Sequence, residues 1–129
     1  MIGNPDKMNY EINQLSSSIS KTKKAISDYV NLEKELRALI AVVKTGTSNI
    51  NQAKDNVKTS FTVDEVPVTG TEIDDLSDEC HEYIEYLEKV LLAKNLSEID
   101  KKRKALNSLV SQRSQKEREL KNLNINSNS

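Results

Sequence analysis

Apolar residues recur along the first half of the chain in a seven-residue pattern. Two interleaved series follow this pattern, and apolar side chains occupy twelve of their sixteen positions. One series comprises Ile12, Ile19, Ile26, Glu33, Ile40, Thr47, Lys54 and Phe61, and the other comprises Met8, Leu15, Thr22, Tyr29, Leu36, Val43, Ile50 and Val57. Because no Pro interrupts the pattern, it predicts one continuous helix over about residues 8–61, which packs through a coiled-coil-like seam.

The second half of the chain carries a similar pattern after a short break. Residues 62–70 include Pro67 and Gly70, which interrupt helices, so a turn is expected there. Thr71, with Asp74 three residues later, is typical of a helix start. The pattern changes phase near residues 90–96, which indicates a local change in helical winding. The expected seam residues are Ile73, Leu76, Cys80, Tyr83 and Leu87, followed by Leu92, Leu96, Ile99, Arg103, Leu106, Val110, Arg113, Glu117 and Leu120.

Two helices of similar length joined by a short segment predict an all-α fold, a long antiparallel two-helix hairpin with coiled-coil-like packing. The helices are expected at about residues 8–61 and 71–123, with a turn at about 62–70. Together they would form a single helical-hairpin domain over residues 8–123. A flexible N-terminus over residues 1–7 and a disordered tail over residues 124–129 complete the expected organisation.

The most apolar run of the chain, Leu36 to Lys44, holds more aliphatic side chains than a two-helix seam can bury. If the chain turns near Val66, this run lies level with the second aliphatic run, Val90 to Ser97. The surplus side chains could simply flank the seam or offset the change of phase. We favour a docking surface for further helices, because exposed aliphatic groups at matching levels promote aggregation. The candidate partner-binding residues are Leu39, Val42, Leu91, Leu92 and Leu96, with Tyr86 as a lesser candidate.

Composition and charge weigh against several classes of partner. The net charge of −1 and the aromatic content of 4% do not favour nucleic-acid binding. Ten acids and no bases lie between Asp64 and Glu88, near the start of the second helix, where the helix dipole favours negative charge. No apolar run approaches the ~20 residues that cross a bilayer, so no membrane insertion is expected. The first residues lack the apolar core of a secretory signal peptide, which predicts a cytoplasmic protein and leaves open export by a signal-peptide-independent route.

Few residues could carry chemistry. Cys80 and His81 are the only cysteine and histidine, and as neighbours on a helix their side chains point about 100° apart. They form neither a Cys–His nucleophile pair nor a tetrahedral metal site. His81 and Glu85 could supply two ligands of a weak surface metal site, but a solvated acidic face is the preferred interpretation. We therefore expect no catalytic residue, metal or cofactor, and predict that the protein is not an enzyme.

The layout of the chain also carries a family resemblance. It consists of the turn sequence "VPVTGTEIDDL", the tyrosine-containing start of the second helix and the tail "IDKKRKALNSLVSQRSQKERELKNL". This layout resembles the small Trp-X-Gly (WXG) proteins of bacterial type VII secretion, in particular the longer hairpins that accompany LXG toxins as targeting or chaperone-like partners. Val68 and Gly70 correspond to the turn motif, with Val in place of Trp. The Tyr-xxx-Asp/Glu export signal of the family does not follow the second helix.

These observations support one main hypothesis for function. The chain is predicted to be a non-enzymatic helical binding module. The resemblance implies a type VII secretion targeting factor or chaperone that docks side by side on the helical N-terminal region of an LXG-type effector. One alternative is a structural coiled coil that self-associates as a homodimer or four-helix bundle. Another is a prefoldin-like holdase, for which the segment between the helices is short.

Overall fold

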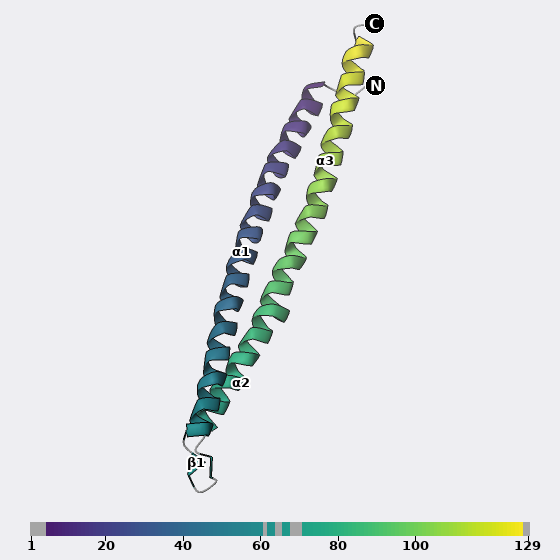
Figure 1. Cartoon of the computed structure of the whole chain (residues 1–129). Helices are drawn as coiled ribbons and strands as arrows, with labels where there is room; N and C mark the ends of the chain where they lie inside the picture. Colours follow the sequence, from purple (N-terminus) through teal and green to yellow (C-terminus); the bar gives the residue numbers. More distant parts are fainter. Residues whose placement is uncertain (1–4, 61, 64–65, 68–70, 128–129) are drawn as a thin grey trace. The chain divides into compact units, whose positions relative to one another are not determined.

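The computed structural model describes residues 5–60, 62–63, 66–67 and 71–127, with side-chain burial described for residues 5–56 and 74–124. Helix α1 spans Pro5–Ser60, and the returning helix consists of α2 (Thr71–Glu85), the π-helical segment η1 (Tyr86–Leu92) and α3 (Ala93–Ser127), as Figure 1 shows. Between them, the two-residue strands β1 (Thr62–Val63) and β2 (Val66–Pro67) pair antiparallel. The predicted all-α helical hairpin is confirmed.

The helices extend further at both ends of the chain than predicted. Helix α1 already begins at Pro5, which suits the first turn because proline lacks the backbone N–H that would stay unpaired there. Asp6 follows in that turn, where the helix dipole favours negative charge. Helix α3 continues to Ser127, beyond the predicted end near residue 123. The predicted turn residues Val68 and Gly70 lie outside the described residues.

The chain divides into two compact units. The terminal unit comprises Met1–Val30 with Ser97–Ser129, and the central unit comprises Asn31–Leu96. In the terminal unit, Glu11 on α1 contacts Lys116 on α3, and Tyr29 on α1 contacts Lys102 on α3. Residue numbers thus rise along one helix as they fall along the other, so the paired helices are antiparallel.

The same antiparallel pairing holds within the central unit. Lys44 on α1 forms an ion pair with Glu88 on η1, with 2.6 Å between Nζ and Oε1. About two turns further along α1, the side chain of Asn51 accepts a hydrogen bond from Ser77 on α2. The C-terminal half of α1 therefore packs against α2 and η1.

The predicted seam of α1 is confirmed wherever side chains are described. Every member of the two heptad series from Met8 to Lys54 is buried or half-buried. Ile19 in the terminal unit and Ile40 in the central unit are its most deeply buried aliphatic members. Val57 and Phe61 lie outside the described side chains. The spacing of apolar residues on this helix was therefore sufficient to identify its packed face.

The seam of the returning helix differs from the prediction in the central unit. Leu76 and Tyr83, both expected in the seam, are exposed, whereas the next residues, Ser77 and Ile84, are turned inward. The physical reason is a polar contact across the helices, in which Ser77 Oγ donates a hydrogen bond of 2.6 Å to Asn51 Oδ1. This bond satisfies the buried serine hydroxyl and keeps Ser77, in place of Leu76, turned toward α1, while the predicted seam residues Cys80 and Leu87 stay turned inward.

In the terminal unit, two further seam predictions are wrong for a related reason. Arg103 and Glu117 are exposed, and the half-buried positions beside them are Lys102 and Lys116. The Lys102 ammonium group lies 5.3 Å from the centre of the Tyr29 ring, and Lys116 pairs with a carboxylate of α1. Long lysine side chains can cover a seam with their aliphatic stems while the charged ends find partners, so burial there does not require an apolar residue.

The change of phase predicted near residues 90–96 occurs slightly earlier, in η1. The inward-facing residues Leu87, Leu91 and Asn95, with the buried Leu92 directly after Leu91, follow one another at intervals of four, whereas a coiled-coil seam alternates intervals of three and four. The wider π-helical turn accommodates the extra residue. As a result, Asn95 is buried and the predicted seam residue Leu96 is exposed.

Candidate functional site

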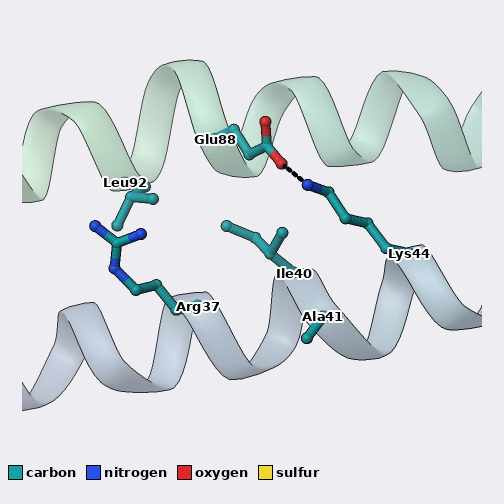
Figure 2. Close-up of a pocket in the computed structure, with 6 residues that line it drawn as sticks. All are labelled: Arg37, Ile40, Ala41, Lys44, Glu88 and Leu92. Carbon is teal, nitrogen blue, oxygen red and sulfur yellow. Dashed lines mark ion pairs between the residues drawn. The ribbon is translucent and has the colours of Figure 1, made fainter.

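The core of the central unit lies level with the two aliphatic runs. Ile40, Leu87 and Leu92 form a buried cluster, and Leu87 is 0% exposed. Figure 2 shows Ile40 on α1 and Leu92 on η1 pointing toward one another. Leu91 is half-buried and packs against this cluster. Leu92 is thus part of the intramolecular core and is removed from the candidate partner-binding set, and Leu91 contributes only an edge.

The remaining candidates are exposed. Val42 is 68% exposed and Tyr86 is 49% exposed, while Leu39 and Leu96 are exposed to a smaller extent. Four further large apolar side chains of the central unit are also exposed; they are Leu32, Leu76, Tyr83 and Val90, of which Leu76 and Tyr83 were predicted in the seam.

The position of each exposed residue relative to the seam determines which face of the central unit it occupies. Two antiparallel helices are related by a two-fold axis perpendicular to the plane that contains them. Rotation about this axis exchanges the two helices but keeps the front face of the pair in front and the back face behind. Residues that directly precede seam residues therefore lie on the same face, whichever helix carries them. Leu39 precedes the seam residue Ile40, and Tyr86 precedes Leu87. These two side chains accordingly share one face.

The same relationship collects most of the exposed apolar residues. We call this surface the apolar face; its members, each directly before an inward-facing residue, are Leu39, Val42, Leu76, Tyr83, Tyr86 and Val90. Leu32 extends it along α1, because it precedes Glu33 of the seam. Gly46 also precedes a seam residue, and a Cβ atom there would meet nothing within 4 Å. The face is therefore open above Gly46.

The opposite face of the central unit is charged. A shallow groove there is lined by Arg37, Ala41, Lys44 and Glu88, together with Ile40 and Leu92 of the core (Figure 2). Arg37, Ala41 and Lys44 each follow a seam residue of α1, and Glu88 follows Leu87. The ion pair between Lys44 and Glu88 therefore confirms the assignment of faces. Leu96 follows the buried Asn95 and belongs to this side, away from Leu39 and Val42.

Polar groups near the turn hold the two helices of the central unit in register. Besides the bond between Ser77 and Asn51, the Lys54 ammonium group forms an ion pair with Asp74. The hydrogen bond that Lys54 donates to the carboxylate of Asp74 raises the pKa of Lys54 above its usual value. His81 lies close by, with its Nδ1 atom 2.8 Å from the carbonyl oxygen of Ser77. These contacts position the apolar face and leave its side chains free.

The described residues offer little chemistry beyond contact. No group of three or more His, Cys, Asp or Glu side chains is placed to hold a metal ion in the part of the chain that the structure describes. Within the same part, no helix is both long enough and apolar enough to cross a membrane. Cys80 is a half-buried free thiol. The arrangement that stands out is therefore the apolar face.

Comparisons with known proteins do not extend this description. No protein-family model matches the chain, and neither the curated proteins nor the solved structures include a match.

Proposed function

We propose that this protein is a non-enzymatic binding module that docks side by side on a helical protein partner through its apolar face. The observation that carries the proposal is the exposure of six large apolar side chains on one face of the central unit, contributed by both helices. Burial of apolar surface yields about 25 cal/mol per Å², so covering this face would stabilise a complex. Leu32 and Leu39 are seven residues apart, as are Leu76, Tyr83 and Val90 in turn. Helices that pack side by side contact one another through residues with this seven-residue spacing.

The partner we propose is the helical N-terminal region of a type VII secretion effector of the LXG class, with this chain as its targeting factor or chaperone. The support is the resemblance of the sequence to hairpin partners of such effectors. The apolar face suits this role, because a helical hairpin laid beside the central unit would complete a helical bundle. A gene for an LXG-type protein next to the gene for this chain would favour the assignment.

The direct test is co-purification of the chain with that neighbouring effector region after co-expression. The double substitution Leu39→Asp with Val42→Asp should abolish the complex and leave the helical circular dichroism signal nearly unchanged, because both side chains are exposed. The matched control, Ala41→Asp with Ser48→Asp, places the same charges on exposed positions of the opposite face and should preserve the complex. Equal loss of binding in both variants would refute docking through the apolar face.

Light scattering on the chain alone tests the competing interpretation. A monomer at low and high concentration is expected if the apolar face is reserved for another protein. A concentration-independent dimer or tetramer that Leu39→Asp with Val42→Asp dissociates would instead assign the face to self-association, as in a structural four-helix bundle.

A further inference from the structure

Three carboxylates border the α2 part of the apolar face. Glu79 precedes the half-buried Cys80 and so lies on the face itself, while Asp75 and Glu82 lie at its outer edge, directly before Leu76 and Tyr83. The spacing of the three acids, four residues and then three, aligns them in one stripe along the helix. All three are exposed, and none of them takes part in an ion pair or side-chain hydrogen bond within the described part of the chain.

Among the residues whose side chains the structure describes, no lysine or arginine is paired with this stripe. From Leu39 to Lys54 on α1 and from Asp75 to Val90 on the returning helix, the lysines are Lys44, Lys54 and Lys89, and no arginine occurs. Lys54 is paired with Asp74, which lies outside the stripe. Lys44 is paired with Glu88 on the opposite face, and Lys89 is paired with Glu85.

Charge near the other end of the face is balanced. There, the exposed residues Glu35 on α1 and Lys94 on α3 both precede seam residues and carry opposite charges. The electrostatic character of the apolar face is therefore uneven along its length. It is acidic near the turn and balanced at the far end.

Resting on the proposed function, we infer that the helix that covers the apolar face carries Lys or Arg residues beside its own apolar stripe, where it passes α2. Like charges three or four residues apart on a helix repel one another, so the stripe of Asp75, Glu79 and Glu82 carries an electrostatic cost in the free chain. Basic side chains of a docked helix would remove this repulsion and form cross-helix pairs, as charges flanking a coiled-coil seam do. The α1 side of the face, with Leu39, Val42 and Gly46, would supply the apolar contact.

The face also indicates how long this helix must be. The stretch from Leu76 to Val90 contains fifteen residues, and a helix rises 1.5 Å per residue, so the part of the face on the returning helix extends over roughly 20 Å. An amphipathic helix of about four turns covers such a distance.

The test uses three labelled synthetic helices of 21 residues that share leucine at the apolar heptad positions and differ only beside them. One carries lysine at the flanking positions, one glutamate and one glutamine, and binding to the full chain is followed by fluorescence anisotropy. We expect the lysine helix to bind about tenfold more tightly than the glutamate helix at low salt, since exposed pairs each contribute modestly and three act together. The difference in affinity between the lysine and glutamate helices should become smaller at high salt, because salt screens solvent-exposed charges.

Two variants locate the effect. Glu79→Lys with Glu82→Lys should reverse the preference, so that the glutamate helix binds more tightly. Asp100→Lys with Glu117→Lys changes the net charge equally but lies on α3, outside the central unit, and should keep the original preference.

The outcomes separate the two proposals. Equal affinity for the lysine and glutamate helices, with binding lost in Leu39→Asp with Val42→Asp, would overturn the charge preference and support docking on the apolar face. A preference for lysine that Glu79→Lys with Glu82→Lys does not change would also overturn the inference, because the acids of α2 would not be its source. Failure of all three helices to bind would overturn both proposals.

Discussion

Ser77 on α2 donates a hydrogen bond of 2.6 Å from its Oγ atom to Oδ1 of Asn51 on α1, in the seam between the two helices of the central unit. Ser77 is buried, and the residue before it, Leu76, is exposed. The bond therefore joins the helices, and it also orients α2 so that an apolar stripe is turned outward. This orientation supplies part of the apolar face.

Removing the Ser77 hydroxyl should destabilise the protein more than the loss of one small side-chain group suggests, because the acceptor on Asn51 is left without its partner. In Ser77→Ala the amide oxygen of Asn51 loses its donor, and we expect a loss of about 1–3 kcal/mol in the free energy of unfolding. Replacing both partners by apolar residues, Asn51→Leu with Ser77→Ala, should recover much of that loss because no buried polar group stays unpaired. Urea denaturation of Ser77→Ala, of Asn51→Leu and of the double variant measures the coupling between the two residues, and purely additive losses of stability would contradict this coupling.

Leu87 and Tyr86 offer a matched comparison of buried and exposed positions. Leu87 is 0% exposed at the centre of the core cluster, so Leu87→Ala should cost about 2–5 kcal/mol of stability. Tyr86→Ala removes a larger side chain from the neighbouring position on the apolar face and should change stability by only about 0.5 kcal/mol. Thermal or urea denaturation distinguishes the two. A large loss for Tyr86→Ala would mean that its ring is part of the intramolecular core.

The sequence predicted α1 better than the returning helix for a physical reason. The seam of α1 is apolar in most heptads, so the spacing of residues such as Ile19 and Ile40 reports directly on burial. On α2, a serine at the seam is satisfied only by Asn51, a residue 26 positions away in the sequence. Periodicity within one helix does not contain that information. A polar residue at matching levels of both helices is the signal that could have found it.

The candidate site was predicted in part for the same reason. Leu39, Val42 and Tyr86 are exposed as expected, because a surplus of apolar residues at one level leaves some of them outside any seam. Tyr83 was assigned to the seam because its spacing from Leu76 fits a heptad equally well. The orientation of α2, in which Ser77 is turned toward Asn51, places Tyr83 on the apolar face and not in the seam.

The ion pair between Glu11 and Lys116 in the terminal unit should make stability depend on pH. The hydrogen bond from Lys116 lowers the pKa of Glu11 below its ordinary value of 4.5. The pair therefore contributes stability above pH 4.5, and this contribution is lost as the pH falls through the lower pKa of the folded state. The same bond raises the pKa of Lys116 above 10.5, so the contribution is also lost as the pH rises through that higher value.

The measurement is the melting temperature of the wild type and of Glu11→Gln between pH 3 and pH 7. The wild type should melt at the higher temperature at neutral pH, and the two curves should converge as the pH falls below 4.5. Glu35→Gln, at an exposed carboxylate of α1, serves as the control and should follow the wild type. A constant difference between wild type and Glu11→Gln at all pH values would show that the ionised carboxylate is not its cause.

The π-helical segment η1 makes a deletion tolerable at one place in the returning helix. Leu87, Leu91 and Asn95 face inward at intervals of four residues, so this part of the seam contains one residue more than a regular coiled-coil repeat. Removing the exposed Lys89 should convert η1 to an ordinary α-helical turn and keep the residues on either side of it in the seam. We expect full helicity and stability within about 1 kcal/mol of the wild type, because only an exposed ion pair with Glu85 is lost.

Removing the exposed Asn107 from α3 provides the control. No surplus residue exists there, so every later residue, including the half-buried Val110 and Leu120, would rotate by about 100° out of the seam. This deletion should lower the unfolding midpoint in urea far more than deletion of Lys89. A surplus residue can be removed without rotating the rest of the helix out of the seam. Equal losses in the unfolding midpoint for the two deletions would therefore mean that η1 does not contain the surplus residue.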